Sequence, residues 1–126
     1  MKEITTDHAP QAIGPYAQAV VVDNLVFCSG QIPLDPETGA VVAGDIKEQT
    51  RQVIQNLTAV LQAANVGLGD VVKTEVYLAH IEDFATMNEV YSEHFISQPY
   101  PARATVEVSR LPKNALVEIS CVAYKK

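Results

Sequence analysis

The stretch DIKEQTRQVIQNLTAVLQAA, residues 45–64, predicts one long amphipathic helix. Its apolar residues at positions 46, 53, 57, 60, 61 and 64 follow the helical period and form one stripe. Asp45 is a favourable N-cap residue, and Glu48 completes the capping-box spacing, with Asp in place of Ser or Thr. The glycines of residues 65–69 suit the left-handed turn that ends a helix. A helix with a single apolar stripe has to be covered by a second layer.

The segment before this helix predicts part of that second layer. A hairpin is expected, with strands at 17–22 and 25–29 and a tight turn at Asp23-Asn24, residues that tolerate positive φ. Residues 31–39 contain two prolines, which prevent a central strand. We expect a short edge strand there, followed by a turn at 36–39.

The second half of the chain predicts a strand at 71–79, a helix at 82–95, and strands at 102–109 and 115–124 joined by the loop 110–114. In the second helix, Phe84, Met87, Tyr91 and Phe95 are spaced to share one buried face. The element order β-β-(β)-α-β-α-β-β predicts one α+β domain over residues 1–126, with two helices on one face of a mixed six-stranded sheet. No element remains to cover the other face, which indicates an oligomer.

Composition excludes several classes of protein. The 126 residues are 48% hydrophobic and 19% charged, which is typical of a folded domain and excludes disorder. No apolar run is long enough to span a membrane, and the polar N-terminus does not resemble a signal peptide, so we expect a cytoplasmic protein. The net charge of −6, without a cationic cluster, does not favour nucleic acid. Cys28 and Cys121 lie in apolar runs and are expected to be buried free thiols.

Two charged residues stand in the middle of apolar strands. Arg103 and Glu118 interrupt the predicted strands 102–109 and 115–124, and alternation places Thr105 on the same face as Arg103. They could form a structural ion pair, lie on a solvated face, or build a site. As a site, the arginine would bind a carboxylate and a partly desolvated glutamate beside it would carry a proton.

Other candidates for chemistry are weaker. Ser29 lies outside any nucleophile elbow and has no spaced His and Asp partners, although Gly30 next to it allows close approach of a ligand. Tyr16 is either an anchored loop aromatic or a pocket hydroxyl. The three histidines are widely separated, so no metal site is predicted.

Several short motifs are spread in order over the whole chain: GPYAQA at 14–19, SGQIP at 29–33, DIKEQT at 45–50, FATMNEVY at 84–91, PARATVEV at 101–108, LPK at 111–113 and VEI at 117–119. Together they resemble the RidA family, the reactive intermediate deaminases also called YjgF-type. The resemblance implies a chorismate-mutase-like fold and a homotrimer with active sites between subunits. It also implies hydrolysis of 2-iminobutanoate and 2-iminopropanoate, released by pyridoxal-phosphate enzymes, to 2-keto acids and ammonia, without metal or organic cofactor.

The resemblance also implies residue roles. Arg103 would hold the substrate carboxylate, and Glu118 would orient the attacking water and manage its proton. The remaining substrate-binding residues would be Tyr16, Ser29, Gly30, Asn88 and Thr105. The position of Thr105 is Cys in some relatives, so a thiol there is not required. The alternatives are a non-catalytic regulatory protein that binds small carboxylates, an RNA-directed protein, or a holdase-like chaperone.

Overall fold

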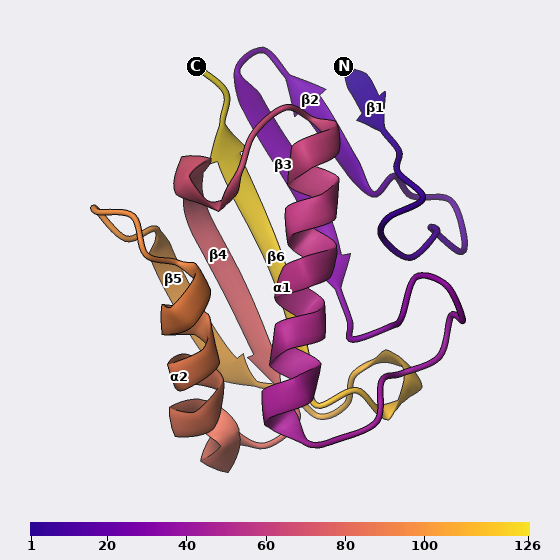
Figure 1. Ribbon diagram of the computed structural model, residues 1–126, viewed down its shortest axis with the longest axis vertical. Helices are drawn as coiled ribbons and strands as arrows, with labels where there is room; N and C mark the ends of the chain where they lie inside the picture. Colours follow the sequence, from indigo (N-terminus) through magenta and orange to yellow (C-terminus); the bar gives the residue numbers. More distant parts are fainter.

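The sheet has six strands in the order β1-β2-β3-β6-β4-β5 in the computed structural model, which describes residues 1–126 (Figure 1). The strands are β1 (Lys2–Ile4), β2 (Ala19–Val22), β3 (Leu25–Gln31), β4 (Val71–Leu78), β5 (Ala102–Glu107) and β6 (Val117–Tyr124). The helices are α1 (Ile46–Ala63) and α2 (Phe84–His94), and single 3-10 turns lie at Leu68–Asp70, Ile81–Asp83 and Pro112–Asn114. All neighbouring strands are antiparallel except β4 and β5, so the predicted mixed sheet is confirmed.

The sixth strand is not the one that the sequence suggested. Residues 31–39 contribute only the end of β3 and one isolated bridge between Leu34 and Val41. The edge strand is instead β1 at the N-terminus, which pairs with β2 through three residue pairs. Three residues with two charges carry too little alternation to predict a strand, and the pairing partner β2 decides their conformation.

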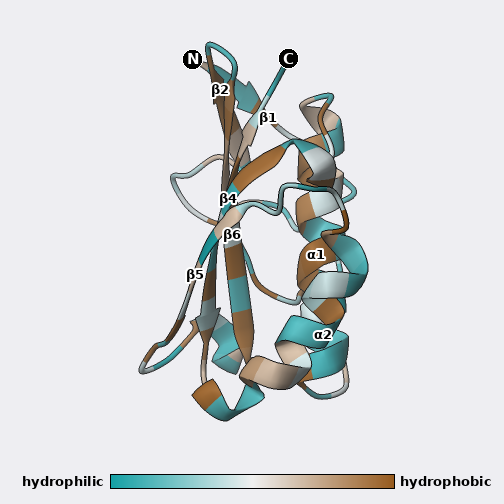
Figure 2. Ribbon diagram, turned by 90° about the vertical axis from the view of Figure 1, so that its left-hand side faces the viewer, coloured by the Kyte–Doolittle hydropathy of each residue, from teal (hydrophilic) through white to brown (hydrophobic).

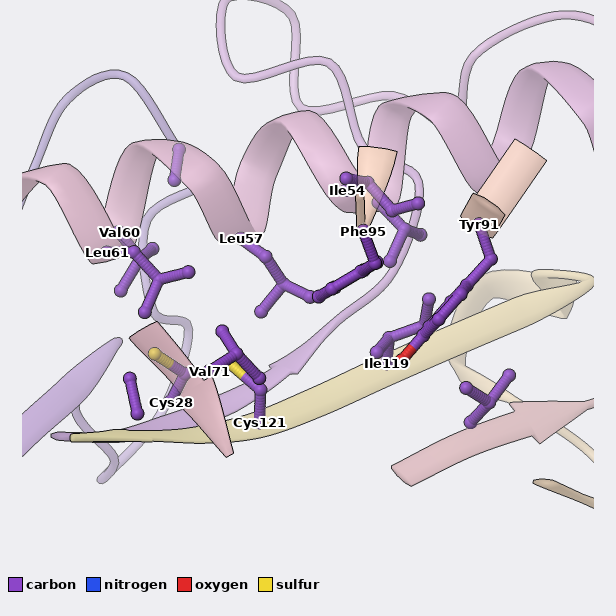
Figure 3. Close-up of a cluster of buried hydrophobic side chains, with 14 of the residues drawn as sticks. Cys28, Ile54, Leu57, Val60, Leu61, Val71, Tyr91, Phe95, Ile119 and Cys121 are labelled. Carbon is purple, nitrogen blue, oxygen red and sulfur yellow. The ribbon is translucent and has the colours of Figure 1, made fainter. Parts of the chain in front are cut away.

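The α1 helix begins as its sequence predicts. The Asp45 side chain accepts from the Lys47 amide at 3.1 Å, and the Glu48 side chain accepts from the Asp45 amide at 3.1 Å, which completes the capping box. The buried stripe of α1 packs on the sheet, where Ile54, Leu57 and Ile119 are fully buried (Figure 3). Burial of such side chains contributes about 1.5–3 kcal/mol each.

The two cysteines lie in the same core. Cys28 of β3 is directly opposite Cys121 of β6, and both are buried free thiols, as expected. A hydrogen bond with Cys28, together with burial, raises the pKa of the Cys121 thiol far above its ordinary value. Neither thiol has the properties of a reactive nucleophile.

Both helices cover the same face of the sheet, and no element covers the other (Figure 2). The bare face carries Val22, Leu25 and Tyr124 in one row across β2, β3 and β6, with Phe27 and Val106 elsewhere on the face. Phe27 is 41% exposed and Val106 is 47% exposed. This matches the expected uncovered face.

Neither helix combines the length and apolar character that a membrane-spanning segment needs.

Candidate active site

Arg103 lies in a cleft between β5 and α2. Its Nη1 donates to Asn88 Oδ1 at 2.8 Å, and its guanidinium carbon lies 4.7 Å from the centroid of the Tyr91 ring and 5.6 Å from that of Phe84. The cleft has a volume of about 480 Å³ and is lined by Asn88, Tyr91, Ser92, Phe95, Tyr100, Pro101 and Arg103. Arg103 therefore lies in a cleft, and its role in binding a substrate stays a prediction.

No carboxylate pairs with Arg103. The salt bridges of the chain are Arg51–Glu93 and Lys73–Glu75, and neither involves Arg103 or Glu118. The guanidinium has five N–H donors and only one protein hydrogen bond, so most of its donors are free for a ligand. The structural ion pair considered from the sequence is therefore excluded within one chain.

Thr105 lies two residues beyond Arg103 on the same face of β5. Its hydroxyl is the only buried side-chain nitrogen or oxygen in the protein without a hydrogen-bond partner. An unsatisfied buried hydroxyl costs about 1–3 kcal/mol and calls for an explanation. Thr105 lines neither cleft of this chain, so the substrate-binding role that the resemblance implies for it stays a prediction.

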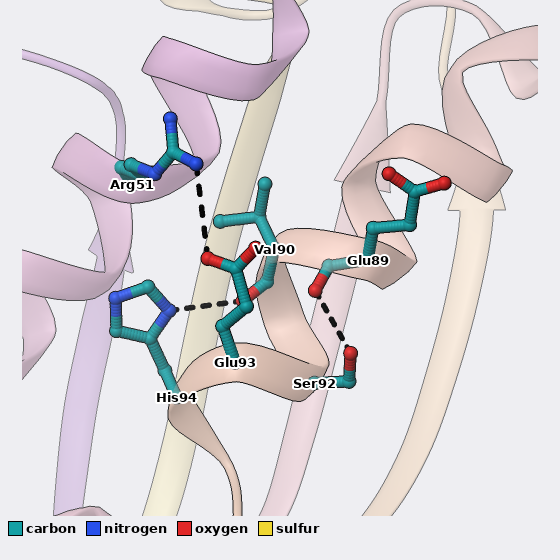
Figure 4. Close-up of polar contacts among 6 residues, drawn as sticks. All are labelled: Arg51, Glu89, Val90, Ser92, Glu93 and His94. Atoms are coloured by element: carbon teal, nitrogen blue, oxygen red, sulfur yellow. Dashed lines mark hydrogen bonds and ion pairs between the residues drawn. The ribbon is translucent and has the colours of Figure 1, made fainter.

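Helix α2 carries Asn88, Tyr91 and Ser92 of the Arg103 cleft. Asn88 and Tyr91 are spaced three residues apart, so they lie on the same side of the helix. Near its C-terminal end, Arg51 of α1 contacts Glu93 at 3.7 Å, and His94 Nδ1 donates to the Val90 carbonyl at 2.9 Å (Figure 4). The ion pair is solvent-exposed and contributes little to stability, but it links α2 to α1.

Glu118 lies on the opposite, bare face of the sheet, against Gly30. A Cβ atom at Gly30 would stand 2.5 Å from Glu118 Oε2, so the carboxylate occupies the space that a side chain would fill. Gly30 lies where the β3–β6 register shifts between Cys28 and Gln31, and this irregularity interrupts the regular pairing of the two strands. The Glu118 side chain makes no hydrogen bond in the chain, and burial raises the pKa of its carboxyl above the ordinary value of 4.5.

Gly30 and Tyr16 line a second cleft of about 340 Å³, together with Gln18, Gln31 and Lys113. Tyr16 is 52% exposed, and its hydroxyl accepts from the Ile13 amide at 3.4 Å, a long hydrogen bond that leaves the ring accessible. Both interpretations of Tyr16, as a loop anchor and as a pocket group, agree with this position.

The Ser29 hydroxyl has a structural partner. It donates to the Ala17 carbonyl at 2.6 Å, and the Ser29 amide donates to the Gln18 carbonyl at 3.0 Å. These bonds fix β3 to the segment before β2. Ser29 therefore holds the backbone beside Gly30, and its hydroxyl proton is already engaged.

The expectation that Arg103 lies beside Glu118 is wrong within one chain. β4 separates their strands: Thr74 is level with both Arg103 and Cys121, whose side chains share the helix-covered face. Glu118 is level with Tyr77 and points to the bare face. β5 does not pair with β6: it lies parallel to β4, which it follows in the chain through α2.

The predicted residues thus divide into two groups. Arg103, Asn88 and Thr105 gather on the helix-covered face. Tyr16 and Gly30 line the other cleft, and Glu118 lies against Gly30 on the bare face. Sequence analysis missed Tyr91 and Tyr100 as cleft residues. Tyr91 follows Asn88 by three residues, and this spacing could have indicated that it shares the cleft. The apolar pattern of α2 instead assigned Tyr91 to the core alone.

Fold and clefts define a class: a small two-layer α+β protein with an unpaired arginine in a cleft and an uncovered sheet face. The family model described as Endoribonuclease L-PSP matches residues 6–125. A RutC family protein of Pyrococcus abyssi is 58% identical over 123 residues, covering 98% of this chain and 96% of the relative. The chain therefore belongs to the RidA family, to which the names RutC and endoribonuclease L-PSP are also applied, and the resemblance is confirmed.

Two further relatives carry more specific descriptions. The 2-iminobutanoate/2-iminopropanoate deaminase of Salmonella typhimurium is 46% identical over 127 residues, covering 99% of this chain and 98% of the relative. The crystal structure of Escherichia coli TdcF with bound serine aligns with a TM-score of 0.93 and 43% identity, covering 100% of both chains.

Proposed function

We propose that this protein hydrolyses 2-imino acids such as 2-iminobutanoate and 2-iminopropanoate to 2-keto acids and ammonia. The observation that carries the proposal is the half-buried Arg103, which has no acidic partner and lies in a cleft large enough for a small acid. Guanidinium groups bind carboxylates through two parallel hydrogen bonds. The Salmonella relative named as a deaminase supports the reaction, and the TdcF neighbour binds serine, another small carboxylate.

The chemistry requires few groups. Arg103 holds the substrate carboxylate. The imine nitrogen is protonated, and water attacks the imine carbon. Glu118 accepts a proton from that water as the C–O bond forms, and returns it to the nitrogen. The C–N bond then breaks, ammonia leaves, and the loss of the hydroxyl proton yields the keto acid. The raised pKa of the Glu118 carboxyl suits a group that takes up and releases a proton.

Because Arg103 and Glu118 lie on opposite faces of one sheet, the proposed site is completed by a second copy of the chain. We propose a homotrimer in which the Arg103 cleft of one protomer meets the bare sheet face of the next, where Glu118 lies against Gly30. The exposed apolar row of Val22, Leu25 and Tyr124 supports this assembly, since such a surface is stabilised by burial. Tyr16 and the Ser29–Gly30 backbone would line the shared cleft, and Thr105 would give its free hydroxyl to the substrate.

The required rate acceleration is modest. Imines hydrolyse unaided in water, and every tenfold acceleration needs about 1.4 kcal/mol of transition-state stabilisation. Anchoring the carboxylate and placing one water can supply several such factors. An elaborate catalytic constellation is therefore not needed.

A second function is favoured by one observation. The carboxylate-binding group lies entirely within a single chain, whereas Glu118 is remote from it. A protein that does not assemble would bind small acids without turnover, as a regulatory module would. RNA binding is less favoured, because the net charge is −6 and phosphate contacts depend on clustered cations.

The test is the decay of 2-iminobutanoate generated in situ by threonine dehydratase, with ammonia and 2-oxobutanoate measured as products. Wild type should accelerate the decay above the spontaneous rate, and Arg103→Ala should lower kcat/KM at least about 100-fold through loss of the two carboxylate hydrogen bonds. Arg51→Ala, which removes an arginine from the exposed α1–α2 ion pair, is the matched control and should retain activity. A wild-type protein that leaves the spontaneous rate unchanged would refute catalysis, and carboxylate binding would then be measured alone.

A further inference from the structure

Tyr91 provides the surface on which the Arg103 guanidinium rests. The tyrosine is 7% exposed, and its ring centroid is the nearer of the two that Arg103 overlies, at 4.7 Å against 5.6 Å for Phe84. A guanidinium over an aromatic ring at this distance is attracted by the ring quadrupole. The only protein acceptor that the guanidinium meets is Asn88 Oδ1, so most of its N–H groups stay free.

The Tyr91 ring is itself held on two sides. Its hydroxyl shares a hydrogen bond of 2.8 Å with Thr74 Oγ1, and both groups are buried. Its ring stacks on Phe95 with centroids 4.2 Å apart and planes 18° apart, and Figure 3 shows the two rings side by side between α2 and the sheet. Thr74 is level with Arg103 on the adjacent strand, so β4 fixes Tyr91 in register with the arginine.

This arrangement solves a problem that an acidic partner would create. An arginine side chain has many rotamers, and a carboxylate that ordered it would also occupy the donors needed for a substrate carboxylate. Asn88 accepts one N–H, and the Tyr91 ring adds a cation–π attraction without a carboxylate. The guanidinium is thereby ordered while most of its edge stays open.

We infer that Tyr91 is a positioning residue, which orders Arg103 for binding of the substrate carboxylate through the face of its ring and is held by Thr74 and Phe95. The inference rests on the proposed function of Arg103 as the carboxylate anchor. Because the carboxylate is bound in both ground and transition states, loss of the ring should raise KM and leave kcat nearly unchanged.

The experiment compares Tyr91→Leu, Tyr91→Phe and Val90→Ala. Tyr91→Leu removes the ring, and we expect it to raise both KM for 2-iminobutanoate and the Kd of 2-oxobutanoate about 5- to 30-fold. Tyr91→Phe keeps the ring and should recover most of the affinity. Val90 is fully buried on the same helix, so Val90→Ala controls for general loss of packing and should leave KM and Kd within about twofold of wild type.

A double-mutant cycle separates positioning from direct contact, because Tyr91 also lines the cleft. The Kd of 2-oxobutanoate is titrated by NMR in Arg103→Ala, Tyr91→Leu and the double variant. If Tyr91 acts through Arg103, the leucine has no further effect once the arginine is absent. Equal losses in both backgrounds would overturn the inference, and so would an unchanged Kd in folded Tyr91→Leu.

The binding titration also separates this inference from the proposed function. If wild type binds 2-oxobutanoate through Arg103 but does not accelerate imine decay, deaminase activity fails while the positioning role is still tested by Kd. If Arg103→Ala does not weaken binding, the proposed anchor fails and the inference with it. If Tyr91→Leu does not fold, the contact is tested in wild type by the NMR chemical shifts of the Arg103 side-chain protons. Absence of an upfield ring-current shift in these protons would overturn the contact.

Discussion

Arg103 and Glu118 lie on opposite faces of the same sheet, with β4 between their strands. The arginine faces the helices and rests on Tyr91, while the glutamate faces the bare side and contacts Gly30. A single chain thus holds the proposed carboxylate anchor and the proposed proton carrier, but holds them apart. The proposed reaction depends on assembly, and the following predictions test its parts.

The raised pKa of the Glu118 carboxyl leads us to expect that both kcat/KM and stability depend on pH. Its pKa is raised by burial, so the acid limb of kcat/KM should lie above pH 4.5, with activity rising as the base ionises. A raised folded-state pKa also favours the folded protein at low pH, and this contribution is lost as pH rises through that pKa. Glu118→Gln should therefore raise the melting temperature at pH 7 relative to wild type, with a smaller difference below pH 4.5, while abolishing the pH-dependent activity. A melting temperature lowered at pH 7 would contradict the burial penalty.

Gly30→Ala should reduce turnover without unfolding the protein. The added methyl group would stand 2.5 Å from Glu118 Oε2, and the flexible carboxylate end can move away. A displacement of about 1 Å in a catalytic group can cost about 100-fold in rate, so we expect kcat to fall about 10- to 100-fold. Gly67→Ala is the control, because nothing lies within 4 Å of its added Cβ. Equal activity of the two variants would remove Glu118 from the mechanism.

Thr105→Val should change stability and affinity in opposite directions. The variant removes the unpartnered buried hydroxyl, which should raise the free energy of unfolding of the free protein by about 1–3 kcal/mol. If the hydroxyl binds the substrate, KM should rise at the same time. Chemical denaturation and steady-state kinetics measure the two effects. A stabilised protein with unchanged KM would show that Thr105 does not contact the substrate.

Phe27→Asp should disrupt the proposed trimer. Phe27 is 41% exposed on the bare sheet face, and a carboxylate there would have to be buried without a partner in the assembly. Light scattering should report a mass near that of one 13.7 kDa chain, with loss of imine hydrolysis. Binding of 2-oxobutanoate should persist in weakened form, since the Arg103 cleft belongs to one chain. Gln55→Asp adds the same charge to exposed α1 and should leave the assembly intact, and a monomeric but active Phe27→Asp would contradict the shared site.

The local elements follow from the sequence because their signals are local. The capping box at Asp45 and Glu48 and the apolar stripe of α1 lie within one helix, and the β2–β3 turn lies at Asp23-Asn24 as expected. Alternation along β5 correctly places Arg103 and Thr105 on one face. The bare sheet face also follows, since two helices can cover only one side.

Tertiary structure alone decided how these elements combine. Nothing within β4, β5 or β6 states that β4 lies between the other two, because strand order results from packing α2 against the sheet and from long-range pairing. That order separates Arg103 from Glu118 and places Thr74 beside Tyr91. The apolar pattern identified Tyr91 as a core residue, and only the fold brings its ring under a guanidinium from another element. The local sequence therefore determines which chemical groups are present and on which face of an element they lie. The distances between these groups depend on contacts between segments far apart in the chain.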